Sequence, residues 1–232
     1  MPGTGVTALT ETVELTRHAL SLGVTRVMML PPFYYKGLSD DALFASYAEI
    51  AERVGDARLR VVLYHIPQFS AVPITFPVIE RLRARYPSTF VGIKDSSGDF
   101  DNMTALVERF PGLSVLAGAD PLMLPLLRKG GAGCITASGN VNVPGIRRLY
   151  DNWRGPQAEA LQAEVTRLRT TLQAYPMIPA LKAIVAHYHN DPDWAMVRPP
   201  LVALDRAQTA ALIADLDKLG FTLGERPQAK AA

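Results

Sequence analysis

The sequence contains very little cysteine and histidine. Cys134 is the single cysteine among 232 residues, so the chain can form no internal disulfide and offers no cysteine cluster for zinc. We interpret Cys134 as a small, buried apolar residue in a strand. The histidine pair His187 and His189 lacks the separation of three or four residues that places ligands on one helix face. Neither residue type therefore indicates a metal site.

Long apolar runs and an excess of one charge sign are also missing. No segment stays apolar over the roughly 20 residues that a membrane-spanning helix needs, and the first residues show none of the features of a signal peptide. The net charge is only +2, too small to indicate binding to nucleic acid or to a membrane surface. The sequence therefore predicts a cytoplasmic location and a small-molecule ligand, without nucleic-acid or membrane partners.

Strand and helix patterns do alternate up to about residue 150. Short connections between repeated βα units are typical of a parallel sheet with right-handed crossovers. The pattern therefore predicts an α/β protein of the (β/α)8 TIM-barrel type. Strands are predicted at 24–31, 59–66 and 90–94 and within 113–120 and 130–140; helices are predicted at about 10–22, 40–53, 75–86, 100–110 and 121–129.

The alternation stops after residue 143, where only helical patterns follow. We expect a C-terminal helical appendage that packs on the barrel, because no low-complexity linker precedes it. The predicted organisation is a partial barrel with catalytic function over 1–150, a helical region over 151–225 and a disordered tail over 226–232. The helices are expected near 143–152, 156–174, 178–190 and 206–219.

The predicted strands are too few for a closed barrel. Five are recognisable, whereas a closed barrel has eight. Residues 3–5, Gly-Thr-Gly, look like the end of a further strand. We expect the first two to three strands to be absent from this chain, which would make it an incomplete record of a longer protein, through a late start codon or a gene truncation.

Two of the predicted strands end in groups that carry chemistry. Lys94 follows the apolar run 90–93, and Tyr64 stands just before Pro67, which ends its strand. A lysine at the end of a core strand loses its proton readily and is a candidate Schiff-base nucleophile, and a phenol is a plausible proton shuttle. The alternatives are a lysine that reaches solvent and a core tyrosine with its hydroxyl at the rim. His65 is expected to point away from Tyr64.

Together, these segments resemble the dihydrodipicolinate synthase / N-acetylneuraminate lyase family of class I pyruvate aldolases. The similarity runs from Gly3 to about Gly220, and the separation of Tyr64 from Lys94 also agrees. The segments that carry it are 3–5 (Gly-Thr-Gly), 32–35 (Pro-Phe-Tyr-Tyr), 64–67 (Tyr-His-Ile-Pro), 92–95 (Gly-Ile-Lys-Asp), 118–120 (Gly-Ala-Asp) and 130–133 (Gly-Gly-Ala-Gly).

The resemblance implies a role for each matching residue. Lys94 resembles the lysine that forms a Schiff base with pyruvate or a 2-keto acid, and Tyr64 the tyrosine that shuttles protons. Tyr34 resembles the tyrosine that reaches across a dimer interface, and the backbone of Ile135 matches a position that lines the pyruvate pocket. The resemblance implies no metal or organic cofactor, and it implies a homo-oligomer, a dimer or tetramer.

The chain departs from the family pattern in two places. The Gly-Thr-Thr-Gly-Glu segment, whose threonines bind the pyruvate carboxylate in the family, is absent. Phe69 occupies the position of the arginine that grips the carboxylate of aspartate semialdehyde in dihydrodipicolinate synthases, and a phenyl ring cannot bind a carboxylate.

Phe69 therefore favours a less acidic partner, such as a 2-keto-3-deoxy sugar acid, over aspartate semialdehyde. The alternatives are a 2-keto-3-deoxy acid dehydratase or dihydrodipicolinate synthase activity on the same fold. An alternative of another class is a non-catalytic truncated barrel.

Overall fold

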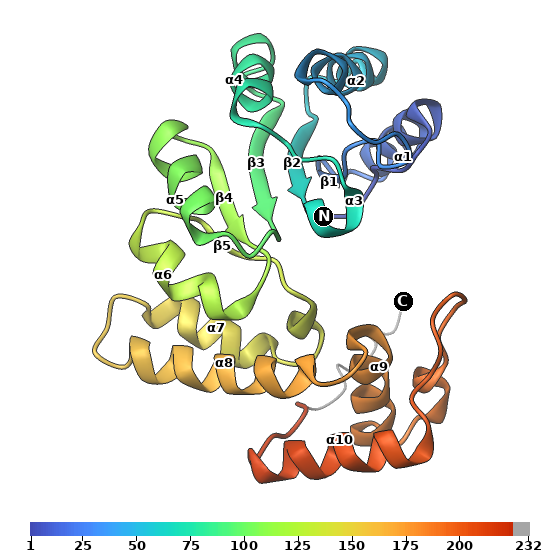
Figure 1. The fold of residues 1–232 in the computed structure, drawn as a ribbon, viewed down its shortest axis with the longest axis vertical. Helices are drawn as coiled ribbons and strands as arrows, with labels where there is room; N and C mark the ends of the chain where they lie inside the picture. Colours follow the sequence, from blue (N-terminus) through green and yellow to red (C-terminus); the bar gives the residue numbers. More distant parts are fainter. Residues whose placement is uncertain (225–232) are drawn as a thin grey trace. The chain divides into compact units, whose positions relative to one another are not determined.

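The computed structural model describes residues 1–224. Their contacts divide the chain into two compact units, residues 1–135 and the residues from 136 onward. Figure 1 shows that the first unit contains the strands and that the second is helical. Each unit is described separately below.

The first unit is built on one five-stranded sheet in which all neighbouring strands run parallel. Strand order follows chain order, as expected when each strand returns through a helix. The predicted parallel sheet is confirmed; four strands lie within their predicted segments, and the third extends one residue beyond the predicted 90–94, to Asp95. The strands are β1 (Arg26–Met29), β2 (Arg60–His65), β3 (Phe90–Asp95), β4 (Ser114–Ala117) and β5 (Gly133–Cys134).

One face of this sheet is fully covered. Leu63, Ile93 and Val115 lie side by side in register and are each 0% exposed, at the centre of the apolar cluster that fills the unit. Because successive side chains of a strand point to opposite faces, their neighbours Tyr64, Lys94 and Leu116 share the other face.

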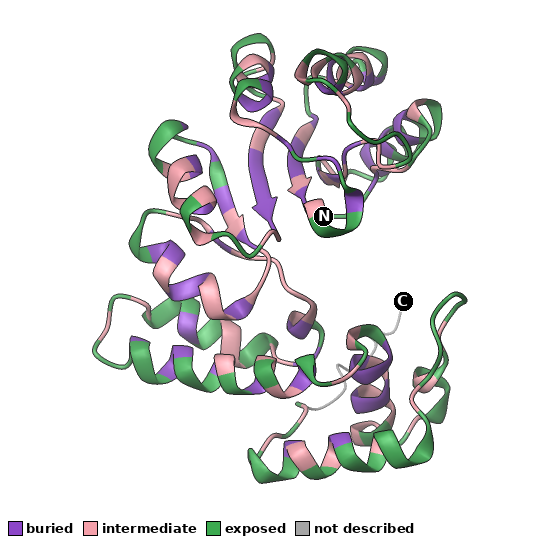
Figure 2. Ribbon diagram, in the orientation of Figure 1, coloured by how far each residue is buried: buried purple, intermediate pink, exposed green. Residues whose placement is uncertain are grey.

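Helices of the first unit lie along the outside of the sheet (Figure 1), and their inward stripes carry most of its buried apolar residues (Figure 2). The α2 helix begins where Ser39 accepts a hydrogen bond from the backbone of Ala42, and it ends at Gly55 in the left-handed conformation. The helices are α1 (Leu9–Ser21), α2 (Asp40–Val54), α3 (Pro67–Ser70), α4 (Phe76–Arg85), α5 (Phe100–Arg109), η1 (Asp120–Leu122) and α6 (Met123–Arg128).

The first residues of the chain pair with the sheet. Gly3 forms a parallel bridge with Met28 of β1, as expected for a strand end. Thr4 is buried, and Thr16 of α1 donates a hydrogen bond to its hydroxyl over 3.0 Å. Thr12 accepts a bond from the backbone of Val6. These hydroxyl groups fasten the N-terminal segment to α1.

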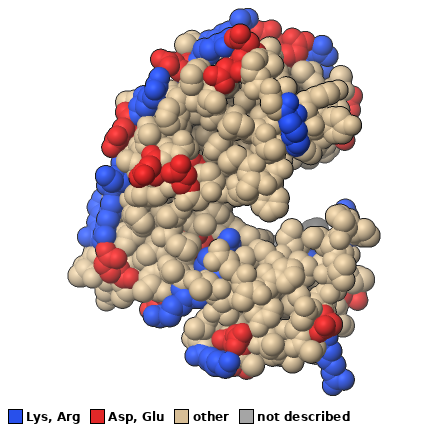
Figure 3. Space-filling view, in the orientation of Figure 1, with Lys and Arg blue, Asp and Glu red and all other residues tan. Residues whose placement is uncertain are grey.

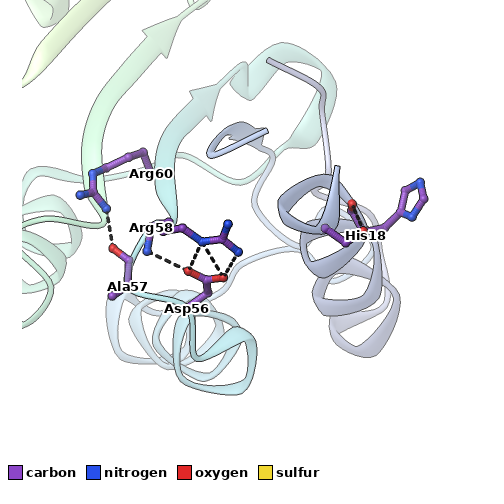
Figure 4. A network of polar contacts seen from close by, with 6 residues as sticks. His18, Asp56, Ala57, Arg58 and Arg60 are labelled. Carbon is purple, nitrogen blue, oxygen red and sulfur yellow. Dashed lines mark hydrogen bonds and ion pairs between the residues drawn. The ribbon is translucent and has the colours of Figure 1, made fainter. Parts of the chain in front are cut away.

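The outer surface of the first unit carries charges of both signs. Over α2 and α4 they form ion pairs, Arg81 with Asp41 at 2.7 Å and Arg85 with Glu52 at 2.6 Å (Figure 3). At the start of β2, Arg58 binds both carboxylate oxygens of Asp56 (Figure 4), which lowers the pKa of Asp56 to about 2. Exposed ion pairs of this kind add little to the free energy of unfolding. The pair of Arg58 and Asp56 lies at the amino end of β2, away from the end that carries Lys94 and Tyr64.

In the described part of the second unit, an apolar cluster centred on Leu172, Ile184 and Leu212 joins the last three of the four long helices. The predicted helices are all confirmed. The α10 helix starts with a capping box between Asp205 and Gln208. The elements are η2 (Ala137–Asn140), α7 (Val143–Asn152), α8 (Ala158–Gln173), α9 (Met177–Tyr188), η3 (Pro192–Ala195) and α10 (Arg206–Lys218).

Some sequence predictions are untested or incomplete. The disordered tail predicted at 226–232 lies outside the described residues. The functional division at residue 150 stays a prediction. The four-residue helix α3 was not predicted, because four residues are too few to show a helical period. None of the helices within 1–224 has both the length and the apolar character to cross a membrane.

Candidate active site

The carboxyl ends of β2 and β3 bring Lys94 and Tyr64 together. The two residues pair in register and therefore project from the same face of the sheet. The ammonium nitrogen of Lys94 lies 4.0 Å from the centre of the Tyr64 ring, which is a cation–π contact. Two residues predicted from separate segments thus form one juxtaposed amine and phenol.

The surroundings of Lys94 leave its amine available. The residue is 8% exposed, so most of its side chain is removed from water. Within the described part of the chain, Nζ forms neither a hydrogen bond nor an ion pair with a carboxylate; its contact is the ring of Tyr64. A lysine amine without a carboxylate partner is suited, once it has lost its proton, to attack a small electrophile.

Asp95 fixes the turn that follows Lys94. This fully buried carboxylate accepts bonds from the backbone and hydroxyl of Ser97, at 2.8 and 2.6 Å, and from the side-chain amide of Asn102 at 2.6 Å. The turn is tied to both neighbouring strands, because Ser96 donates its backbone N–H to His65 and Gly118 donates to Asp95. The end of β3 is therefore rigidly placed.

Gly118 allows the chains at this end of the sheet to approach closely. A Cβ atom at this position would lie 2.0 Å from the hydroxyl oxygen of Ser96. Only glycine fits this position without moving the turn after Lys94. The Gly-Ala-Asp segment that the sequence singled out thus serves to pack β4 against β3.

Cys134 lies near the same group of residues. Its sulfur is 3.3 Å from the sulfur of Met123, and burial raises the pKa of the thiol to about 12, with Asp120 adding to the rise and Lys94 opposing it. The thiol is therefore neutral near pH 7. The predicted place in a strand, β5, is confirmed, whereas the residue as a whole is partly exposed and not fully buried as predicted.

The other predicted site residues are more exposed. Tyr34 is 72% exposed and packs edge to face against Tyr35, at 5.3 Å between ring centres. Phe69 of α3 is 79% exposed. Ile135 follows β5 and donates its backbone N–H to Ala117 at 2.9 Å. None of these three residues has a described contact with the amine of Lys94.

The side chains of Lys36 and Gln68 form hydrogen bonds that organise the loops around the strand ends. Lys36 donates to the carbonyls of Phe33 and Ser70, which joins the loop that carries Tyr34 to α3. Gln68 donates to the carbonyl of Ser96 at 2.6 Å, which joins α3 to the turn after Lys94. Sequence reasoning missed these contacts, because they join residues about 30 positions apart.

Metal binding has no support in the described part of the chain. Among residues 1–224, no group of three or more His, Cys, Asp or Glu side chains is arranged to hold a metal ion. Asp95, the acidic group next to Lys94 in the sequence, uses both carboxylate oxygens for hydrogen bonds to Ser97 and Asn102.

Comparison with known proteins gives a consistent result. A family profile described as "Dihydrodipicolinate synthetase family" matches residues 1–219. An uncharacterized DapA-like lyase from Chloroflexus aurantiacus is 36% identical over 218 residues, which is 94% of this chain and 72% of that protein. A 4-hydroxy-tetrahydrodipicolinate synthase from Methanopyrus kandleri is 28% identical over 230 residues, with the same shares of the two chains.

Solved structures show the same fold. A prophage protein of the dihydrodipicolinic acid synthase family from E. coli K12, solved in complex with pyruvate, superimposes with a TM-score of 0.84 at 26% identity and covers 94% of this chain and 74% of that chain. The dihydrodipicolinate synthase of Agrobacterium tumefaciens gives a TM-score of 0.83 at 27% identity, with the same coverage. The βα repeat of the first unit is therefore of the TIM-barrel type, with five of its strands present here.

Proposed function

The chain belongs to the dihydrodipicolinate synthetase family of lyases and aldolases, and we propose that it forms a Schiff base between Lys94 and pyruvate or another 2-keto acid. One observation carries this proposal: the amine of Lys94 is buried at a strand end and faces the ring of Tyr64 at 4.0 Å. The pyruvate complex of the E. coli relative supports the choice of keto acid.

The chemistry follows from an amine and a phenol placed side by side. The neutral amine of Lys94 attacks the keto carbon, and the resulting hydroxyl group takes up a proton and leaves as water. The positively charged imine then draws electrons from the adjacent carbon, which can lose a proton to become a nucleophilic enamine or can be released from a cleaved carbon–carbon bond. Tyr64 is proposed to carry the protons in these steps.

Phe69 supports a substrate whose far end is not a carboxylate. It stands at the position of the arginine that binds aspartate semialdehyde in dihydrodipicolinate synthases, and its ring offers no hydrogen-bond donor. We therefore favour a 2-keto-3-deoxy sugar acid, or another aldol product of pyruvate and an aldehyde. A dehydratase acting through the same imine is the second candidate, and analysis of products separates carbon–carbon from carbon–oxygen cleavage.

We also propose that copies of this chain form a homo-oligomer. The exposed rings of Tyr34 and Tyr35 are suited to an interface between copies of this chain, since aromatic side chains are enriched in interfaces. Light scattering after gel filtration gives the mass in solution, and a monomer would contradict the homo-oligomer. Cytoplasmic location stays a prediction.

The direct test is trapping of the imine. The protein is incubated with pyruvate and borohydride, which reduces an imine to a stable amine, and the modified peptide is mapped by mass spectrometry. We expect a single adduct on Lys94 and none in Lys94→Arg, which keeps the charge but lacks a reactive amine.

The outcome separates the functional classes. An adduct on Lys94 establishes imine chemistry, after which aldehydes and 2-keto-3-deoxy acids can be screened. Strong turnover of aspartate semialdehyde with pyruvate would overturn the substrate assignment. A folded sample that gives no adduct contradicts the proposal and favours the non-catalytic barrel.

A further inference from the structure

His65 occupies the end of β2 on the face opposite Tyr64. The alternation of the strand directs it away from Tyr64, as the sequence predicted, and it is 7% exposed. Its Nδ1 atom accepts a hydrogen bond from the backbone N–H of Ile74 over 3.1 Å, and this bond is buried. His65 is therefore a buried imidazole that serves as an acceptor.

The hydrogen bond between Ile74 and His65 holds the loop that follows α3, residues 71–75. The loop turns sharply at Ala71, whose φ of 52° is left-handed, and then buries Val72 and Ile74 at 2% and 4% exposure. A buried N–H without an acceptor costs free energy, so the conformation of this loop depends on Nδ1 of His65 carrying no proton. The neutral imidazole must then carry its proton on Nε2.

The same loop determines the position of α3. That helix lies between His65 and Ile74 in the chain and presents Gln68 and Phe69. Gln68 bonds to the carbonyl of Ser96, two residues after Lys94. We propose that His65 is a positioning residue, which holds α3 over the end of β3 through Ile74 and releases it when the imidazole is protonated.

Protonation of His65 changes its Nδ1 atom from a hydrogen-bond acceptor into a donor. The N–H on Nδ1 would then face the N–H of Ile74, and two buried donors cannot bond to each other. Asp95, the neighbouring acidic residue on β3, is held in place by its hydrogen bonds with Ser97 and Asn102. The loop must move to relieve the clash.

The charges around His65 set the pH at which this occurs. Burial lowers the pKa of His65, while Asp95 on β3 and Asp99 before α5 oppose the change. Asp40 of α2 lies near the end of the loop, where it accepts the hydroxyl proton of Thr75 at 2.7 Å. Because the folded state favours the neutral ring, the bond is present above about pH 6.5 and is lost as pH falls through the lower pKa of the folded state.

Hydrogen exchange tests this proposal without any reference to catalysis. Exchange of the Ile74 amide is followed from about pH 8 down through the pH at which the nitrogen chemical shifts of His65 show that the ring takes up its second proton, corrected for the intrinsic pH dependence of exchange. In the wild type we expect protection of Ile74 to fall by at least tenfold on the acid side, while amides in β3 keep theirs. Uniform protection across this range would overturn the proposal.

Two variants separate positioning from mere packing. In His65→Asn, an amide oxygen can occupy the place of Nδ1 and accept at every pH, so the acid-side loss should disappear. His65→Leu lacks an acceptor and should show low protection at all pH values. Nitrogen chemical shifts of His65 give a second readout should either variant fail to fold: a proton on Nδ1 at neutral pH contradicts the proposal.

The effect on turnover rests on the proposed function and is measured separately. If the enzyme is active, lowering the pH should raise KM for the aldehyde or sugar-acid partner more in the wild type than in His65→Asn. Failure to trap an imine on Lys94 would remove only this prediction about KM, because the hydrogen-exchange results on Ile74 do not depend on imine chemistry. Equal pH profiles of KM in an active enzyme would overturn the link between His65 and α3.

Discussion

At the scale of single residues, the site depends on how two strand ends direct neighbouring side chains. Lys94 and Tyr64 share a face of the sheet, whereas His65 and Asp95, each one residue further along, share the other. We propose that the first pair carries the chemistry. In the second pair, His65 accepts a bond from the loop after α3, and Asp95 accepts bonds from the turn after β3.

The first prediction concerns the hydroxyl group of Tyr64. Tyr64→Phe keeps the ring that packs under Lys94, so the protein should remain folded. Loss of a proton carrier should slow imine formation or turnover by about 10²–10⁴-fold. The rate of borohydride-trapped adduct measures this, with circular dichroism as the control for folding. An unchanged rate would remove Tyr64 from the mechanism.

A second prediction follows from the pKa of Cys134, raised to about 12 by burial. Alkylation requires the thiolate, so iodoacetamide should label the folded protein slowly, at a rate that keeps rising with pH up to about pH 9 without levelling off, because the pH stays well below the raised pKa. In denaturant the rate should be much higher and should level off above the ordinary thiol pKa of about 8.5. Rapid labelling of the folded chain near pH 8 would contradict the neutral, buried thiol.

At the scale of elements, close contact between the ends of β3 and β4 supports the position of Lys94. The turn after β3 bonds to β2 and β4 through backbone groups, and glycine at position 118 leaves room for Ser96. The α3 helix is joined to this turn by Gln68 and to the loop of Tyr34 by Lys36. The loops therefore depend on one another.

The third prediction tests this packing. Gly118→Ala places a methyl group 2.0 Å from the Ser96 hydroxyl, so the turn must shift, and the free energy of unfolding should fall by about 1–3 kcal/mol. Gly3→Ala is the matched control, because the nearest atom would be 3.9 Å away; we expect a change within about 0.5 kcal/mol. Urea unfolding measures both. Equal effects of the two substitutions would show that the close approach is unimportant.

At the scale of the whole molecule, the described chain has two apolar clusters. One draws all its members from the first unit and the other all its members from the second. Leu82 and Leu172 are fully buried residues of the two clusters. Each unit therefore has a core of its own.

The fourth prediction is that a substitution in one apolar core affects mainly the unit that contains it. Leu82→Ala and Leu172→Ala should each destabilise their own cluster by about 2–5 kcal/mol through the cavity they leave. Hydrogen exchange should increase first in the unit that carries the substitution. An identical increase throughout 1–224 for both variants would indicate a single cooperative core instead.

The sequence by itself determined the order and type of the long elements. Apolar periodicity identified all five strands and the long helices, since burial of one face leaves a repeating pattern in the chain. It also placed Lys94 and Tyr64 at strand ends, because a polar turn follows Lys94 and Pro67 ends the strand of Tyr64. The family resemblance, carried by short motifs, is confirmed by the match over residues 1–219.

Only the tertiary structure decided which of these groups meet. The 4.0 Å contact of Lys94 with Tyr64 depends on the register between β2 and β3, and the bonds of Gln68 and Lys36 join loops from different βα units. His65 serves as an acceptor because the loop after α3 folds back and brings the N–H of Ile74 to its ring. Such contacts leave no local pattern, because each results from packing between segments that are separated in the chain and adjacent in space.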